Sequence, residues 1–413
     1  MRLMQASLRL FVLVVSISLF LAVGPGNAQA QDGPGAVYVM TNRATGNSIV
    51  AHRRAANGAL SWAQEVSTQG LGSGAGLGSQ GALVLSDDGS LLLAVDAGSN
   101  EISVLTVANR GLQFASKASS EGIRPVSITE HEGLVYVVNG GGTPNISGFT
   151  LSESGQLIPI PGSTVALAGG ATAGPAQVEF SPDGDLLLVT EKGTGLIDIF
   201  NVGDDGRVSA PTTQVSNNPT PFGFAFGRYG LVVVSEAVGG AAGASTLSSY
   251  RTTDQSTLNT ISKSIPDTQT AACWVVITKH ARFAFTSNTG SGTISSYALE
   301  PDGELNLSDA VSGKHWGRQQ SDRYGSESPQ SISLRLDARD KQRSWIPCFR
   351  WIPDTRSNYF GAPSKQHWDC GTLSQGCSAR SCRIRAWVSR RRAEFLSALS
   401  SDGEQVFDHE KSC

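Results

Sequence analysis

Short apolar segments separated by tight turns recur along most of the chain. The clearest copy runs from Gly174 to Arg207 and reads GPAQVEFSPDGDLLLVTEKGTGLIDIFNVGDDGR. We predict strands over residues 177–180, 185–190 and 196–202, because each is apolar and is bounded by residues typical of turns. Proline presets φ and glycine supplies positive φ, so these turns have a physical cause. This copy is therefore predicted to be a meander of short strands.

The same unit recurs at regular intervals. The glycines that end the first turn of four copies, Gly89, Gly133, Gly184 and Gly230, are separated by 44, 51 and 46 residues. A period of about 40 to 50 residues, with three or four short strands in each, is the signature of a propeller blade. A pair of β-sandwiches is the alternative. The regular spacing favours an all-β fold, a β-propeller with about six recognisable blades.

The other copies follow the same order of strands and turns. The predicted strands are residues 36–40, 48–53 and 60–66; 82–85, 91–95 and 102–107; 125–129, 134–138 and 146–151; 222–226, 231–235 and 247–251; and 274–278, 283–287 and 294–299.

The repeat resembles a known family. Its pattern is Xaa-Pro-Xaa-Xaa-Val-Xaa-Phe-Ser-Pro-Asp-Gly, an apolar strand ending in Asn, Asp or Glu, then Gly-Xaa-Gly and Ile-Xaa-Xaa-Phe. This resembles the seven-bladed lactonase propellers, a family of 6-phosphogluconolactonase-like proteins and fungal carboxymuconate cyclases. Residues 136–139, Tyr-Val-Val-Asn, also resemble the YVTN repeat of surface-layer propellers. The resemblance covers residues 36–313 and implies a seven-bladed ring.

The pattern stops near Lys314, before a seventh blade. The tail, residues 314–413, is rich in arginine and holds five of the six cysteines and five of the seven tryptophans. A separate cysteine-rich domain, disulfide-bonded after export, is one explanation. We favour a shifted reading frame, because a one-nucleotide shift with permissive codons turns residues 374–383 into a segment resembling the family's closing strand. Five cysteines without Cys-Xaa-Xaa-Cys spacing give little support for zinc.

The tail also bears on how the ring closes. The first copy begins with residues 36–40 and lacks the first strand that the other copies have. Propellers remove open edges by closure. We therefore expect the tail to supply this strand. We also predict an imperfect seventh blade that is poorly ordered beyond about His315, with exposed edges beside the first and sixth blades.

The amino terminus has the features of a secretory signal. Arg2 and Arg9 form a basic region, residues 10–23 are apolar, and residues 28–30, Ala-Gln-Ala, form a cleavage site. A transmembrane anchor is the alternative, and the small-residue site argues against it. The predicted organisation is a signal peptide over 1–30, cleaved after Ala30, propeller repeats over 31–313 and the anomalous tail over 314–413. The mature chain is predicted to be secreted or periplasmic.

One position of the repeat carries most of the candidate chemistry. The slot after the apolar second strand is occupied by Asn42, Asp96, Asn139, Glu191, Glu236 and Asn288. Asn and Asp bond their own backbone in turns, so a structural role is the first interpretation for them. Glutamate is less natural in turns, so Glu191 and Glu236 are the candidate catalytic groups, with a solvated rim charge as the alternative.

Two cations are candidates for binding a carboxylate. Arg124 precedes the first strand of its copy, and a guanidinium bonds bidentately; Lys192 follows Glu191 and faces either that carboxylate or an anionic substrate. An exposed arginine is the simpler interpretation of Arg124. Asn139 and Asn288 complete the predicted substrate-binding set. No histidine stands before a first strand, and no Gly-Xaa-Ser-Xaa-Gly elbow occurs in a strand-to-helix context.

These features define two functional hypotheses. The resemblance implies an enzyme that hydrolyses a lactone or cycloisomerises a carboxymuconate-type acid, without metal or cofactor. The alternative is a non-catalytic binding or scaffold propeller at the cell surface or in the periplasm. The net charge of −3 offers no basic footprint for nucleic acid. We expect a small-molecule partner, no membrane span after cleavage, and a monomer.

Overall fold

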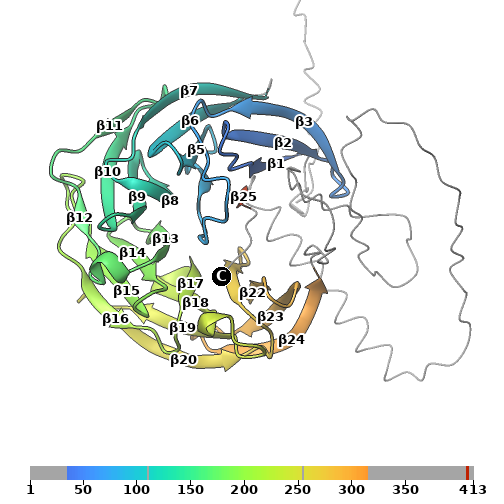
Figure 1. Ribbon diagram of the computed structural model, residues 1–413. Helices are drawn as coiled ribbons and strands as arrows, with labels where there is room; N and C mark the ends of the chain where they lie inside the picture. The colour runs from blue at the N-terminus through green and yellow to red at the C-terminus, as the bar shows by residue number, and fades with distance from the viewer. Residues whose placement is uncertain (1–34, 109–110, 254, 315–405, 409–413) are drawn as a thin grey trace, which may run out of the picture. The chain divides into compact units, whose positions relative to one another are not determined.

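The described residues form six small β-sheets arranged around a ring (Figure 1). The computed structural model describes residues 35–108, 111–253, 255–314 and 406–408, all within one unit, Asp32–Cys413. The only helical segments among these residues are three short 3-10 turns. The predicted all-β propeller with about six blades is therefore confirmed.

We number the blades I to VI along the chain and give their strands from the inside outward. Blade I contains β25 (Val406–Asp408), β1 (Gly35–Met40), β2 (Ser48–Arg54) and β3 (Leu60–Ser67); blade II contains β4 (Leu83–Leu85), β5 (Leu91–Asp96), β6 (Glu101–Ala108) and β7 (Gly111–Ser119); blade III contains β8 (Ile123–His131), β9 (Leu134–Gly141), β10 (Asn145–Leu151), β11 (Leu157–Pro159) and β12 (Val165–Ala166); blade IV contains β13 (Pro175–Phe180), β14 (Leu186–Glu191), β15 (Leu196–Asn201) and β16 (Thr212–Val215); blade V contains β17 (Pro221–Phe226), β18 (Leu231–Glu236), β19 (Thr246–Thr252) and β20 (Leu258–Pro266); and blade VI contains β21 (Ala272–Ile277), β22 (Phe283–Asn288), β23 (Thr293–Leu299) and β24 (Leu305–Lys314).

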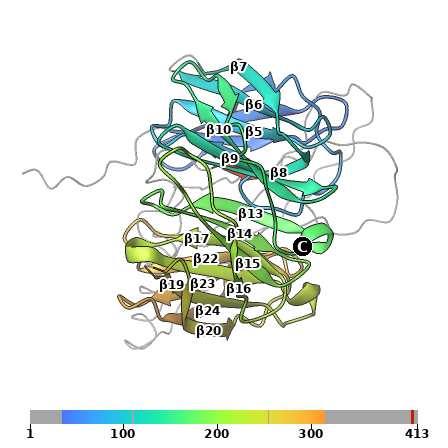
Figure 2. The same ribbon diagram turned by 90° about the vertical axis from the view of Figure 1, so that its left-hand side faces the viewer.

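The second strands form the core of the blades. Every residue of β5 and β18 is buried. Both faces of these strands are covered, so their sequences are continuous apolar runs instead of an alternating pattern. Figure 2 shows blade IV, β13 to β16, between its neighbours. Stacking of neighbouring blades thus buries the faces that one small sheet could not bury alone.

The outermost strands of blades II to VI were not among the predicted ones, whereas β3 of blade I was predicted as residues 60–66. Of the nine residues of β20, only Leu258 and Ser262 are buried. β7 is similarly open on one side. An outer strand packs on one neighbour and meets solvent elsewhere, so its sequence is too polar to stand out. Blades I, II, IV, V and VI therefore have one strand more than the three predicted apolar runs, and blade III has two more.

The start of the inner strand has an unusual backbone in five blades. A residue at or near the start of the strand has a positive φ in each case: Gly81 (79°), two residues before β4; Arg124 (56°), the second residue of β8; and Gly174 (54°), Thr220 (61°) and Ala271 (56°), each directly before its strand. A left-handed conformation is costly for residues other than glycine, and most of all for a β-branched one. In blades III to VI the pairing register shifts immediately afterwards, which is the mark of a β-bulge.

Side chains of the inner region join neighbouring blades. Ser127 Oγ on blade III accepts a hydrogen bond from Val178 N on blade IV at 3.1 Å. The Gln177 amide on blade IV accepts from Phe224 N at 2.7 Å and donates to Phe224 O at 3.0 Å on blade V. These bonds satisfy inner-strand backbone groups that no further strand reaches.

The first blade receives its inner strand from the far end of the chain. The three residues of β25 pair with β1 in parallel, with Tyr38 opposite Val406. We expected a strand from the tail at this position, and the structure has one. It differs from the other inner strands, which are antiparallel to their neighbours. The signal peptide and the predicted disorder of the tail beyond His315 lie outside the described residues.

A matched pair of glycines tests the turn between β14 and β15. A Cβ on Gly193 would lie 2.0 Å from Thr172 O, whereas a Cβ on Gly195, at φ +73°, would meet nothing within 4 Å. We expect G193A to lower the free energy of unfolding by about 3 kcal/mol through overpacking. G195A should cost about 1 kcal/mol, from backbone strain alone. Urea unfolding of both variants measures the difference; equal losses would contradict the close approach.

Candidate functional site

The six slot residues lie at equivalent positions of the six blades, and all are buried. Asn42 follows β1 and is 7% exposed, and the other five, in or at the end of β5, β9, β14, β18 and β22, are 0% exposed. A solvated rim charge therefore does not describe Glu191 or Glu236. Their role as catalysts stays a prediction, and their contacts show what else they do.

Glu236 is surrounded by hydrogen-bond donors. Its carboxylate accepts from Ser216 Oγ and Asn218 N, both at 3.1 Å, in the connection that enters blade V. It also accepts from Thr246 Oγ1 at 2.5 Å and Ser248 Oγ at 2.8 Å on the next strand. Burial raises the pKa of Glu236, and these donors oppose the rise. The carboxylate thus ties the incoming connection to the blade.

Asp96 does the same in blade II. Its carboxylate accepts from Thr68 Oγ1 at 2.7 Å, Asn47 Nδ2 at 2.8 Å and Ser103 Oγ at 2.5 Å. Burial raises the pKa of Asp96 as well. Thr68 lies in the connection from β3 to β4, so the tie again joins an incoming connection to a third strand.

The asparagines make fewer bonds in the same slot. Asn139 Nδ2 donates to Ser120 O at 3.0 Å, and Asn288 Nδ2 donates to Ser295 Oγ at 2.8 Å. The amide oxygens of both residues are buried without a partner among the described residues. These bonds reach neighbouring elements, so the expected bonding of Asn to its own turn is not the main interaction.

Glycines in the incoming connections make room for the slot side chains. A Cβ on Gly70 would lie 2.3 Å from Asp96 Cγ, and a Cβ on Gly122 would lie 2.4 Å from Asn139 Cγ. A Cβ on Gly169 would lie 2.2 Å from Glu191 Oε2. Close packing therefore requires glycine at these three positions, because any Cβ would collide with the slot side chain.

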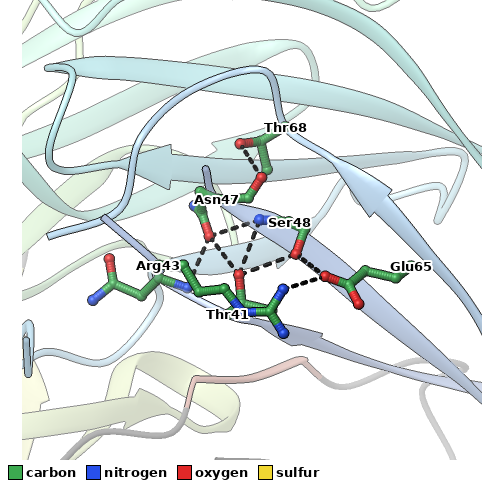
Figure 3. Close-up of polar contacts among 7 residues, drawn as sticks. Thr41, Arg43, Asn47, Ser48, Glu65 and Thr68 are labelled. Atoms are coloured by element: carbon green, nitrogen blue, oxygen red, sulfur yellow. Dashed lines mark hydrogen bonds and ion pairs between the residues drawn. The ribbon is translucent and has the colours of Figure 1, made fainter. Parts of the chain in front are cut away.

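Blade I has a related network of its own, shown in Figure 3. Asn47 Oδ1 accepts from Asn42 N at 2.8 Å and from Ser48 N at 3.0 Å. Ser48 Oγ donates to Glu65 Oε1 at 2.6 Å, which also pairs with Arg43 at 2.6 Å. The Ser48 hydrogen bond is the main cause that lowers the pKa of Glu65. The slot is thus a polar centre in this blade too.

Blade IV combines two buried carboxyl groups. Glu191 Oε1 accepts from Gly169 N at 3.0 Å, Oε2 accepts from Thr194 Oγ1, and Asp198 Oδ2 accepts from Ala168 N at 2.9 Å. Asp198 is 0% exposed, like Glu191. Burial, and then the neighbouring Glu191 carboxyl, raise the pKa of Asp198 to about 7. The sequence analysis did not select Asp198.

The two predicted substrate-binding cations converge on one connection. Arg124 Nη2 on blade III lies 3.4 Å from both Gly76 O and Leu77 O. Lys192 Nζ on blade IV bonds to Gly78 O. The ammonium group also lies 4.8 Å from the centre of the Phe222 ring, within cation–π range.

The same connection also bonds to blade VI and to the inner strand of blade IV. Trp274 Nε1 on β21 donates to Ser79 O at 2.9 Å, and Gln80 Oε1 accepts from Val275 N at 3.0 Å. Gln80 N donates to Ala176 O on β13 at 2.9 Å. We call residues 76–80 the plug segment, because side chains from blades III, IV and VI bond to it and it reaches the middle of the ring (Figure 1).

Glu179 is a carboxyl group that the sequence analysis missed. It lies on β13 and pairs with Leu188 of β14, which comes three residues before the slot residue Glu191. Gln177 Nε2 donates to it at 2.6 Å, and burial raises the pKa of Glu179 to about 8, although the residue keeps partial solvent access. The same register places uncharged residues on the other inner strands: Val84, Thr129, Ala225 and Val276. Aligning the inner strands would have revealed it.

The described histidines and acidic residues do not form a second candidate site. His131 ends β8, its side chain is 22% exposed, and its Nδ1 pairs with Asp87 Oδ2 at 3.1 Å. In the described part of the chain, no three His, Cys, Asp or Glu side chains lie close enough to hold a metal ion. No helix there is long and apolar enough to cross a membrane.

Comparison with known proteins agrees with this architecture. Residues 36–166, which include blades I to III, match the family described as "Lactonase, 7-bladed beta-propeller". The resemblance to the lactonase propellers is confirmed. The match covers the plug segment and Arg124, and ends before Glu179, Glu191 and Lys192. No curated protein matches the chain.

Solved structures show the same fold at low sequence identity. The periplasmic gluconolactonase of Pseudomonas aeruginosa is 14% identical, with a TM-score of 0.52 over 66% of this chain and 83% of that chain. A putative 6-phosphogluconolactonase from Bacteroides uniformis is 14% identical, with a TM-score of 0.51 over 65% and 79%. A protein from Lactobacillus plantarum is 15% identical, with a TM-score of 0.51 over 66% and 83%. These likenesses extend to the fold alone.

The buried tie at Glu236 predicts a stability effect. E236Q places an amide N–H₂ group among four donors, so at least one donor loses its acceptor. We expect the variant to lose about 2 kcal/mol of unfolding free energy in urea at pH 7. R207Q is the control, because Arg207 is exposed and pairs with Asp205 on the surface; it should change by less than about 0.5 kcal/mol. An E236Q loss as small as the control's would contradict the tie.

Proposed function

We propose that the protein is an exported lactonase-like propeller that binds a small lactone or carboxylate at the plug segment. The family match over residues 36–166 supports a lactonase-like function at the level of the family. A periplasmic gluconolactonase with the same fold is compatible with a secreted or periplasmic location. The predicted signal peptide and cleavage after Ala30 belong to this proposal.

One observation carries the choice of site. Arg124 and Lys192 come from different blades, and both bond to carbonyl oxygens of residues 76–78. A carbonyl oxygen carries a partial negative charge, so these oxygens stand in for the anionic oxygens of a ligand. A guanidinium and an ammonium group that already point at oxygen are suited to a carboxylate or phosphate. Ligand binding would displace the carbonyls of the plug segment.

The proposed reaction is ring opening by water. Water adds to the lactone carbonyl carbon, the ring C–O bond breaks, and the proton from water passes to the ring oxygen, which leaves a hydroxy acid. A carboxyl group near the substrate would carry this proton. Glu191 and Glu236 remain the proposed carriers, and Glu179 joins them because its raised pKa and partial access suit proton transfer near neutral pH. A carboxymuconate cycloisomerase would use the same groups in ring closure.

A second function is favoured by a different observation. The carboxylates of Asp96 and Glu236 are occupied by ties to the connections that enter their blades. A propeller whose slot groups all serve the fold would be a binding or scaffold protein without chemistry. Activity measurements on the full chain separate the two functions.

Hydrolysis of gluconolactone and its 6-phosphate tests the proposal. We expect R124Q and K192Q each to raise KM for the phosphorylated lactone about tenfold, the effect of losing roughly 1.4 kcal/mol of binding. R207Q, which removes a cation remote in sequence from both, should leave KM unchanged. Hydrolysis by the folded wild type that is no faster than the uncatalysed rate would reject the enzyme and favour the binding protein.

The proton carrier is tested by three single substitutions. We expect the substitution at the true carrier, among E179Q, E191Q and E236Q, to lower kcat by about 10²-fold or more. For E236Q this loss must exceed what its lower stability explains, so folded fractions are measured by circular dichroism in the same buffer. Unchanged kcat in all three variants would exclude these carboxyl groups from the reaction.

A further inference from the structure

Blade IV departs from the repeat at one buried position. Asp198 on β15 pairs with Val189, two residues before the slot residue Glu191. The same register on the third strands of four other blades holds a serine in every case: Ser103, Ser147, Ser248 and Ser295. Only blade IV, among these five, replaces a neutral hydroxyl with a second carboxyl group.

The replacement of serine by aspartate changes the hydrogen bond that the slot residue can accept from the third strand. Ser103 Oγ donates to Asp96 at 2.5 Å, and Ser248 Oγ donates to Glu236 at 2.8 Å. A serine hydroxyl always carries a proton to donate, whereas a carboxyl group donates only when it is protonated. Asp198 can therefore reproduce the serine bond only by holding a proton.

The geometry leaves a place for this proton. Asp198 Oδ2 accepts from Ala168 N, and Glu191 Oε1 accepts from Gly169 N. Asp198 Oδ1 is buried and has no hydrogen-bond partner among the described residues. A buried carboxylate oxygen without a donor is costly, and two neighbouring buried carboxylates repel each other. Burial and the Glu191 carboxyl both raise the pKa of Asp198.

Among the described residues, no ion pair joins a lysine or arginine to Glu191 or Asp198. The segment from Leu167 to Ala173, together with β12 and β16, carries no titratable side chain. Lys192, on the turn after Glu191, directs its ammonium group to Gly78 O and the Phe222 ring. A shared proton is therefore the compensation that the described groups leave for two adjacent carboxylates.

We propose that Glu191 and Asp198 share one proton, and that loss of this proton releases the segment Leu167–Ala173 from blade IV. The bond that breaks is the O–H···O bond between the two carboxyl groups, and the proton leaves to water. The segment is held by the Ala168 and Gly169 amides and by the bond from Gly193 N to Ala173 O. Its release would open the rim beside Lys192. This inference stands independently of the proposed function.

The direction of the pH effect follows from linkage. In the closed state the pKa of Asp198 is about 7, and in an open, solvated state it returns to about 4. The closed state therefore binds more protons between these values, and it loses stability as pH rises. The opening constant should increase up to about tenfold per pH unit from pH 5 to pH 7 and level off above about 7.

Amide hydrogen exchange of the full chain tests this. We expect the opening constant at Ala168 and Gly169, corrected for the intrinsic rate, to rise at least tenfold between pH 5 and pH 7.5. D198S restores the residue of the other blades and should remove the pH dependence, as should D198N. A wild-type opening constant that stays flat, or a rise that persists in D198S, would overturn the proposal.

A matched variant in blade V tests whether a second buried carboxyl group is sufficient for pH-dependent opening. S248D places a carboxyl group beside Glu236, in the position that Asp198 has beside Glu191. The opening constant of the Asn218 amide, which donates to Glu236, should then rise more steeply with pH than in the wild type, where burial already raises the pKa of Glu236. A folded S248D protein whose Asn218 amide shows no steeper rise would contradict the assignment. Native-state exchange reports on the folded molecules, so partial loss of stability does not obscure the result.

Discussion

The ring depends on how each blade is joined to the connection that enters it. The connection arrives from the outer strand of the preceding blade and carries backbone and hydroxyl groups into a region where water is excluded. A buried carboxylate or amide at the end of the second strand bonds to those groups, as Asp96 does with Thr68 and Glu236 does with Asn218. A backbone N–H buried without an acceptor would cost a large part of a domain's stability. The slot is therefore polar because the fold needs it to be.

This requirement explains what the sequence could and could not predict. The apolar second strands, the turns and the slot positions were all visible, because each depends on local residue types. The burial of Glu191 and Glu236 was not visible, since it depends on a connection more than fifteen residues away closing over them. The outer strands of blades II to VI were missed for a related reason: β20, for example, is largely open, so its sequence has no strong apolar pattern.

Because the blades repeat, residues that differ from their equivalents in other blades are not recognised from single motifs. Glu179 lies in a strand that reads as an ordinary inner strand, and Asp198 lies in one that reads as an ordinary third strand. Each becomes distinctive only when the pairing register aligns it with Val276 or Ser248 in other blades. Arg124 and Lys192 were predicted from the sequence as substrate-binding residues, which stays a prediction. Their shared partner, the plug segment, was not predicted because it is a glycine-rich connection without a distinctive motif.

Blade IV contains three charged residues that the other blades lack at the equivalent positions discussed above or that bond to the plug segment. The structure compensates each of these charges in a different way. Lys192 is compensated by a carbonyl and an aromatic ring, so it adds charge to the rim with a partner in place. Glu179 is compensated by one amide and by a raised pKa, so it is neutral in much of the physiological range. Asp198 accepts one backbone hydrogen bond, from Ala168 N, and its other oxygen has no donor among the described residues. Two neighbouring buried acids are most stable with a proton between them. A serine at this position would be cheaper, as four other blades demonstrate. In a repeat in which four other blades share one solution, a costlier solution in a single blade is what a fold retains when that blade has a separate task.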